Sequence, residues 1–171
     1  MKKTVVRILL IVFIIAINIG CDQSTKYLAK KHLRDTGVVQ VAGDYIILRY
    51  AENNGAFLSI FSSLPRNIRT VLLIILPVLA MALMALYLVR SARLPTPYLI
   101  ALCSILGGGV SNVLIDRAFN NHHVIDFMNI GIGPVRSGIF NFADLSILFG
   151  SVAIVILTYA GRHDRKIPVE R

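Results

Sequence analysis

Four long apolar stretches dominate this chain of 171 residues. They run over about residues 4–20, 71–89, 98–115 and 139–160, and each is long enough to cross most of a bilayer's hydrocarbon core as an α-helix. Apolar residues make up 56% of the sequence and charged residues only 16%, which is more apolar surface than a soluble domain of this size can bury. The sequence therefore predicts an all-α membrane protein, one domain over residues 1–171 with four transmembrane helices.

Two longer connections join these helices on the same side of the membrane. The first, about residues 21–70, alternates apolar and polar residues over 38–41 and 45–50, on either side of Gly43-Asp44. This pattern predicts a small β-hairpin. The second, about residues 116–138, is rich in glycine near its end, and we expect a short loop that turns back to the membrane.

The charge distribution indicates the orientation of the chain. There are 18 Lys and Arg residues against 9 Asp and Glu, a net charge of +9. The basic residues form no single face or run, which argues against a nucleic-acid partner. Half of them lie at the two termini and between the second and third spans, in short segments beside span ends. Because such residues stay on the cytoplasmic side, we expect both termini to be cytoplasmic.

The first span resembles a lipoprotein signal peptide. It has a basic start, an apolar stretch and the step Gly20-Cys21. Asn18, however, stands three residues before the cysteine, where such signals usually carry an apolar residue. A protein of several spans also needs this helix as its first span. We therefore expect residues 1–20 to remain attached.

Eight polar residues fall near the outer ends of the predicted spans. Ionisable residues at membrane depth are costly and are functional hypotheses by default. Random placement would scatter them over both sides of the membrane. The eight residues are Asp22, Lys26, Asn112, Asp116, Arg117, Asp126, Asn141 and Asp144.

Several of these residues also have a purely structural explanation. Asp22 and Lys26 are spaced as an ion pair within one helix. Asp116-Arg117 would equally serve as an interfacial anchor at a helix end, and Asn141 as a helix cap. A structural explanation fits Asp126 and Asp144 less well, because each carboxylate stands among apolar neighbours.

Two half-buried carboxylates indicate a mechanism. Like charges close together cannot both ionise cheaply, so the two groups share a proton. The ionised carboxylate takes a proton from an attacking water, and the protonated one donates to the peptide carbonyl oxygen. Asp126 and Asp144 therefore suit aspartic-protease chemistry, which needs no metal or cofactor.

Other classes of function fit the sequence less well. His122 and His123 are adjacent and no H-E-x-x-H motif occurs, which disfavours a metalloprotease. A Ser–Lys dyad that uses Lys26, Lys30 or Lys31 stays open as an alternative catalytic site. A transporter or channel would carry polar groups near the bilayer centre, whereas a non-catalytic lipid-binding subunit would use the same cavity without turnover.

Taken together, the polar motifs resemble those of the lipoprotein signal peptidase (signal peptidase II) family. Five blocks occur in the family's order and cover nearly the whole chain. They are Asp22-Gln23-Ser24-Thr25-Lys26, Asn53-Asn54-Gly55-Ala56-Phe57, Asn112 through Asp116-Arg117, Val124-Ile125-Asp126-Phe127, and Phe140-Asn141-Phe142-Ala143-Asp144.

The resemblance implies a multi-pass enzyme of the bacterial inner (cytoplasmic) membrane, with a small periplasmic β-sheet, a short periplasmic loop and an active site near the periplasmic face. Its partners would be a lipid-modified prolipoprotein, cleaved just before the diacylglyceryl-modified cysteine, and membrane lipid; we expect a monomer without cofactor or metal. Asp126 and Asp144 would be the catalytic pair. The residues that would bind substrate or support the site are Asp22, Lys26, Asn54, Asn112, Asp116, Arg117 and Asn141.

One spacing departs from the family pattern. The family usually has asparagine three residues before the Asp-Arg pair, whereas Asn112 precedes Asp116 by four. Positions three and four apart share a helix face, so a local bulge in the helix would preserve the role of Asn112.

Overall fold

Four long helices form the body of the molecule. The computed structural model describes residues 2–55, 61–91, 93–119 and 123–164. The first helix is α1 (Lys2–Leu33), and α5 (Phe142–Asp164) is the last. Between them, α2 (Arg66–Thr70), the π-helix η2 (Val71–Ile75) and α3 (Leu76–Arg90) follow one another directly, as do α4 (Thr96–Gly109) and the π-helix η3 (Val110–Arg117).

The four predicted spans are confirmed as helices long and apolar enough to cross a membrane. They cover Thr4–Leu33, Arg66–Arg90, Thr96–Arg117 and Phe142–Arg162. The first is longer than predicted, because α1 continues through Gly20-Cys21 as far as Leu33. Asp22 and Lys26 therefore lie within the helix, and not in a connection after it.

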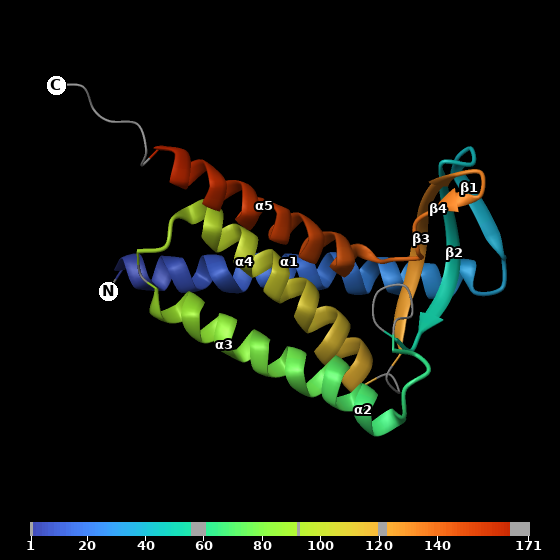
Figure 1. The fold of residues 1–171 in the computed structure, drawn as a ribbon, viewed down its shortest axis with the longest axis horizontal. Coiled ribbons are helices and arrows are strands. Elements are labelled where there is room, and N and C mark those ends of the chain that lie inside the picture. Colours follow the sequence, from blue (N-terminus) through green and yellow to red (C-terminus); the bar gives the residue numbers. More distant parts are fainter. Residues whose placement is uncertain (1, 56–60, 92, 120–122, 165–171) are drawn as a thin grey trace.

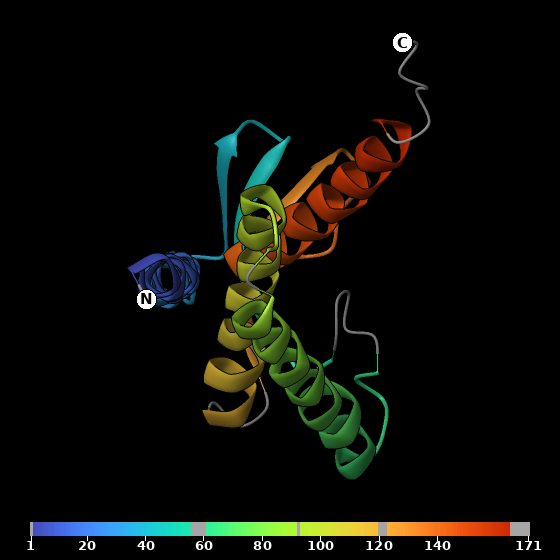
Figure 2. The same ribbon diagram turned by 90° about the vertical axis from the view of Figure 1, so that its left-hand side faces the viewer.

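Helix α4 lies at the centre of the bundle and contacts α1, α3 and α5 (Figures 1 and 2). Glycines allow two of these approaches. A Cβ added at Gly107 would lie 2.7 Å from the Cβ of Asn18 in α1. A Cβ at Gly108 would lie 2.6 Å from the carbonyl oxygen of Ala143 in α5, so any side chain there would push the start of α5 away.

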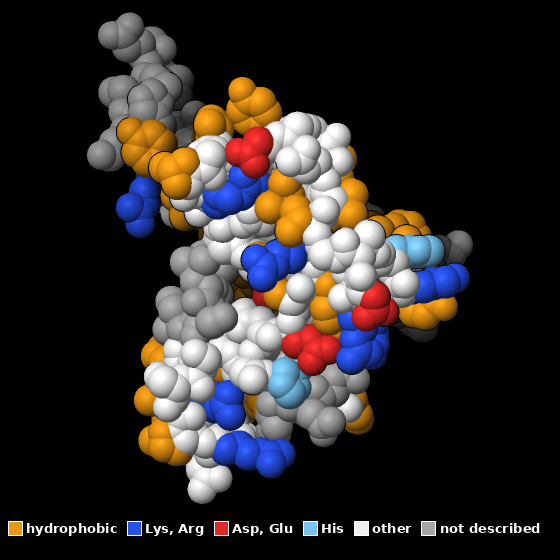
Figure 3. Space-filling view, turned by 90° about the vertical axis from the view of Figure 1, so that its right-hand side faces the viewer, with side chains coloured by type: hydrophobic (Ala, Val, Ile, Leu, Met, Phe, Trp, Pro, Cys, Tyr) orange, Lys and Arg blue, Asp and Glu red, His pale blue; other side chains and the backbone are white. Residues whose placement is uncertain are grey.

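A four-stranded antiparallel sheet of order β1-β2-β3-β4 closes one end of the bundle, opposite the start of α1 (Figure 1). The predicted hairpin is confirmed as β1 (Val38–Ala42) and β2 (Ile46–Asn53). Seen from this end, the molecule shows charged side chains of both signs interspersed with apolar ones (Figure 3).

The second connection was predicted to be a loop, and this prediction is wrong for much of its length. Residues Val124–Ile132 form β3, which pairs with β2, and Val135–Arg136 form the short strand β4. Of its glycines, Gly131 lies in β3, Gly133 lies in the turn between the strands with a φ of +53°, and Gly138 follows β4. Strand β3 gains its hydrogen bonds from β2, more than 70 residues earlier in the chain, and local sequence patterns do not reveal such a partner.

Two apolar cores hold these parts together. One lies among α1, α3 and α4 and contains Leu88, Leu99 and Cys103. The other joins the outer end of α1 to the sheet through Ala29, Leu33 and Phe127. The second core attaches β3 to α1, which brings Asp126 to the same end of the bundle as Asp22 and Lys26.

Candidate active site

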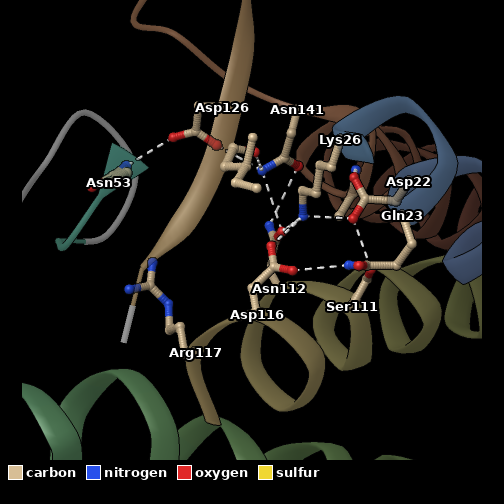
Figure 4. Close-up of polar contacts among 12 residues, drawn as sticks. Asp22, Gln23, Lys26, Asn53, Ser111, Asn112, Asp116, Arg117, Asp126 and Asn141 are labelled. Atoms are coloured by element: carbon tan, nitrogen blue, oxygen red, sulfur yellow. Dashed lines mark hydrogen bonds and ion pairs between the residues drawn. The ribbon is translucent and has the colours of Figure 1, made fainter. Parts of the chain in front are cut away.

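Most of the polar residues predicted from sequence meet where α1, η3, β3 and the start of α5 converge (Figure 4). Most of their side chains are buried, as is that of a serine in η3. Buried polar groups are stable only if they are hydrogen-bonded to one another. The buried members of this polar cluster are Asp22, Lys26, Ser111, Asn112, Asp116, Arg117, Asp126 and Asn141.

Lys26 is the hub of the polar cluster. Its Nζ lies 2.5 Å from Oδ2 of Asp22 and 2.6 Å from Oδ2 of Asp116. It also donates to Oδ1 of Asn112 at 2.6 Å. The ion pair expected from the i,i+4 spacing is present, but it is buried and shared with a second carboxylate on η3.

This arrangement argues against a Ser–Lys dyad. An ammonium group that donates to three acceptors has no lone pair with which to activate a serine hydroxyl. Lys30 and Lys31 are exposed on α1. The nearby Ser111 directs its hydroxyl to Oδ2 of Asp22 at 2.7 Å, and not to a lysine.

The π-helix η3 explains the unusual spacing of Asn112 and Asp116. Hydrogen bonds from residue i to i+5 add one residue to the turn, and with a spacing of four both side chains lie on the side of η3 that faces Lys26 Nζ. The local bulge expected from the sequence is therefore confirmed. Single π-turns are frequent at functional sites.

Asn141 joins Asp126 to Asp144. Its side-chain Nδ2 donates to Oδ1 of Asp126 at 2.7 Å, and its backbone N–H donates to Oδ2 of Asp144 at 3.0 Å. In return, the backbone N–H of Asp144 donates to Oδ1 of Asn141 at 2.9 Å. This exchange is a capping box at the N-terminus of α5. The residue that caps the helix therefore also sets the positions of both carboxylates.

Asn112 connects Asp144 to Lys26. Because Lys26 donates to Oδ1 of Asn112, the Nδ2 of that amide is turned toward Oδ1 of Asp144, to which it donates at 2.9 Å. The charge of Lys26 thus fixes which way the Asn112 amide faces.

The environment of Asp126 favours its protonated form. Burial, and after it the negative charge of Asp144, raise the pKa of Asp126 to about 6, against the lowering effects of hydrogen bonds from Asn53 and Asn141 and of the charge on Lys26. A carboxyl group with such a pKa can release and take up a proton near neutral pH.

Of the two asparagines at the end of β2, the one that contacts Asp126 is not the one predicted from the sequence. Asn53 donates from Nδ2 to Oδ2 of Asp126 at 3.0 Å, whereas the predicted Asn54 is exposed. Asn53 is the last residue of β2, and Asn54 lies in the bend after it, where it lines a small hollow with Arg117. The sequence could not show which of the two contacts Asp126, because this depends on the register of β2 against β3.

Arg117 also contacts this segment, as its Nη2 donates to the carbonyl oxygen of Gly55 at 2.5 Å. Ala56 and Phe57 of the same motif, and His122, lie outside the described residues. Gln23 and Ser111 were not predicted as site residues, although both belong to the hydrogen-bond network (Figure 4).

Comparisons with known proteins show the family of this chain. Residues 14–160 match a family described as signal peptidase (SPase) II. The chain is 36% identical to a lipoprotein signal peptidase of Treponema denticola over 158 residues, which is 89% of this chain and 90% of the relative. It is 31% identical to one of Rhodococcus jostii, over 89% of this chain and 74% of the relative.

The fold is similar to that of solved structures. A bacterial membrane enzyme determined at 2.3 Å resolution superimposes with a TM-score of 0.77 and 23% sequence identity, over 97% of this chain and 94% of that one. The family match over residues 14–160 contains every member of the polar cluster as well as Asp144.

Proposed function

The chain belongs to the signal peptidase II family, and on that premise we propose that it is an aspartic endopeptidase that removes signal peptides from bacterial prolipoproteins. Cleavage occurs just before the diacylglyceryl-modified cysteine. Asp126 and Asp144 are the catalytic pair. The observation that carries this assignment is the bridge made by Asn141, which donates to Asp126 at 2.7 Å and to Asp144 at 3.0 Å.

The pair hydrolyses the peptide bond with one shared proton. The ionised carboxylate accepts a proton as the water oxygen attacks the carbonyl carbon, and the protonated carboxyl group gives its proton to the carbonyl oxygen. When the C–N bond breaks, a proton returns to the leaving nitrogen. The N-terminus of α5 favours negative charge on Asp144, whereas Asp126 lies on strand β3 and has no helix N-terminus beside it. Asp144 is therefore the better-placed base and Asp126 the acid.

The other members of the polar cluster hold the pair in place or bind substrate. Asn112 and Asn141 orient Asp144, while Lys26, Asp22 and Asp116 form the charged layer behind them. Arg117 and Asn53 lie on the opposite side of Asp126, beside the end of β2. Both are placed to contact the peptide near the scissile bond. Asn54 lines a small hollow with Arg117 and supports the site from there.

The orientation follows from the same arrangement. We place both termini in the cytoplasm, and the sheet and the active site at the periplasmic face of the inner membrane. Three features support this: basic residues beside the far span ends, the mixed charges of the sheet end (Figure 3), and a substrate whose lipid lies in the outer leaflet. We also propose that the enzyme is a monomer that takes its substrate from the surrounding lipid.

The test uses purified protein in detergent and two forms of one precursor, with and without the diacylglyceryl group on its cysteine. Gel mobility and product mass report cleavage. We expect the lipidated precursor to be cut once, directly before the modified cysteine, and the unmodified form to stay intact. Binding of the lipidated precursor without any cleavage would contradict the proposal and indicate a lipid-binding subunit.

A further inference from the structure

Two side chains of the network have no part in the chemistry proposed above. Ser111 of η3 is completely buried, and its Oγ lies 2.7 Å from Oδ2 of Asp22. Gln23 of α1 donates from Nε2 to Oγ of Ser111 and to Oδ1 of Asp116, both at 2.9 Å (Figure 4). Together they join the two carboxylates that flank Lys26.

The donors and acceptors of this link allow one arrangement of protons. The amide nitrogen of Gln23 can only donate, so Ser111 Oγ accepts from it. The hydroxyl proton of Ser111 is then left for Asp22, whose ionised carboxylate can only accept. Turning the Gln23 amide over would place its oxygen against Asp116 and Ser111, and the link would be lost.

The Asp22 carboxylate, oriented by Ser111, is hydrogen-bonded to the start of α5. Its Oδ2 accepts from Ser111 and pairs with Lys26, while its Oδ1 accepts from the backbone N–H of Ala143 at 2.8 Å. Ala143 directly precedes Asp144. A rotation of the Asp22 carboxylate would therefore move both the first turn of α5 and the Lys26 ammonium group.

A second route from Lys26 ends at the same residue. Lys26 Nζ donates to Asn112 Oδ1, and Asn112 Nδ2 donates to Asp144 Oδ1. Ser111 is thus connected to Asp144 through Asp22 and α5, and also through Asp22, Lys26 and Asn112.

The charges explain why neutral donors occupy these positions. One ammonium group serves two buried carboxylates, which leaves one negative charge in excess. Ser111 donates to one carboxylate and Gln23 to the other, and hydrogen bonds to charged acceptors are among the stronger ones. A second cation would serve the same carboxylates but would also attract the charge of the catalytic pair.

We propose that Ser111 and Gln23 are positioning residues for hydrolysis, which hold Asp22 in the orientation that places Asp144 for catalysis. Neither touches the catalytic carboxylates in the structure. The inference rests on the proposed aspartic chemistry. The π-helix makes it possible, because the widened turn brings Ser111, Asn112 and Asp116 toward α1 together.

The test is Ser111→Ala, with kcat and KM measured on the lipidated precursor. We expect kcat to fall about tenfold or more, since a hydrogen bond to a charged group is lost and a second is left without its acceptor. KM should change less than about threefold, because substrate contacts are not altered. Ser111→Thr, which restores the hydroxyl group, should recover much of the loss. A purely structural role predicts loss of folded protein with kcat per folded molecule unchanged.

The matched control is Ser104→Ala on the same helical span. Ser104 lies in an apolar groove with Ile100 and Phe149, away from the polar cluster, and this variant should match the wild type. Gln23→Met is the second test variant. It should lower kcat less than Ser111→Ala, and combining the two should add little, because Gln23 acts partly through Ser111. If Ser111→Ala does not fold, a loss of kcat in Gln23→Met still supports the proposal, and an unchanged kcat overturns it.

Asp126→Asn, assayed in parallel, separates the two proposals. If Asp126→Asn is inactive while Ser111→Ala and Gln23→Met keep the wild-type kcat, the positioning role is wrong and the proposed function stands. If Asp126→Asn cleaves normally, the aspartic mechanism itself is wrong.

Discussion

The two parts of helix α1 reverse the usual relation between polarity and burial. Before Gly20 the helix is apolar and exposed; Phe13, for example, has 61% of its surface accessible. After Gly20 it turns polar and two of its charged residues are buried, Asp22 at 0% and Lys26 at 2%, whereas Lys30 and Lys31 near its end are exposed. Lipid surrounds the first part, so its apolar residues need no protein partner. The two buried charges in the second part are tolerated because they pair with each other and with Asp116 of η3.

This difference shows at which positions of the helix the identity of the residue matters. The lipid-facing part needs only apolar residues of about the right length. The polar part needs particular residues at particular positions, because each donor must meet an acceptor on η3, β3 or α5. Substitutions of the buried polar residues in the second part should therefore have large effects, and those of lipid-facing residues in the first part small ones.

The largest effect is expected at the catalytic pair. Asp126→Asn and Asp144→Asn should each lower kcat by at least about 10³-fold, because an amide cannot exchange the shared proton. A fixed-time gel assay on the lipidated precursor measures the loss, and Leu9→Ala on the lipid-facing part is the control that should keep its rate. Near wild-type turnover by either Asn variant would argue for a different mechanism.

Removal of the hub cation should have the next largest effect. Lys26→Met leaves Asp22 and Asp116 buried together without a counter-charge, which should destabilise the fold by about 3–5 kcal/mol and abolish most activity. Lys30→Met, at an exposed position of the same helix, should be close to neutral. Thermal unfolding in detergent compares the two. Equal unfolding temperatures would show that the buried charges are not balanced by Lys26.

A packing change outside the polar cluster sharpens the comparison further. In Gly108→Ala the new methyl group would meet the Ala143 carbonyl oxygen at 2.6 Å, so the first turn of α5 must shift, at a cost of about 1–3 kcal/mol. We expect turnover to fall about tenfold through the displaced Asp144. Gly20→Ala has no atom within 4 Å of its added carbon and should be silent. If both variants behave alike, close packing of α4 on α5 does not position the site.

The smallest effect is a shift in pH dependence. Since burial raises the pKa of Asp126 to about 6 and its protonated form is the acid, kcat/KM should fall as the pH rises above about 6. Asn53 donates to Asp126 and lowers its pKa. Asn53→Ala should therefore raise that pKa and move the alkaline limb to higher pH, which a kcat/KM profile across the neutral range detects. A shift to lower pH would have the wrong sign.

Features that depend on local sequence patterns could be predicted, whereas features that depend on contacts between distant residues could not. The four spans and the β1–β2 hairpin depend on local patterns of length and alternation, and both are confirmed. The identity of β3 as a strand was missed, because its partner β2 is distant in the chain. Most residues of the site could be predicted because charged side chains stand among apolar neighbours in the sequence, which a structural role alone does not explain.

The remaining site residues depended on geometry that the sequence does not carry. Asn53 and Asn54 are equivalent until the strand register is known. Ser111 is a small polar residue in a helix, and nothing in its neighbours indicates that it faces Asp22. Asn112, by contrast, was predicted from its sequence motif, and the π-helix η3 accounts for its unusual spacing.

The most direct test of the central claim is a double-mutant cycle on the catalytic pair. Single-turnover cleavage of the lipidated precursor is measured for the wild type, Asp126→Asn, Asp144→Asn and the double variant, each with enzyme in excess. If the two carboxylates share one proton and act as a unit, the double variant should be little slower than either single variant. A double variant slower by the product of the two single effects would show that the carboxylates act independently, and would contradict the account.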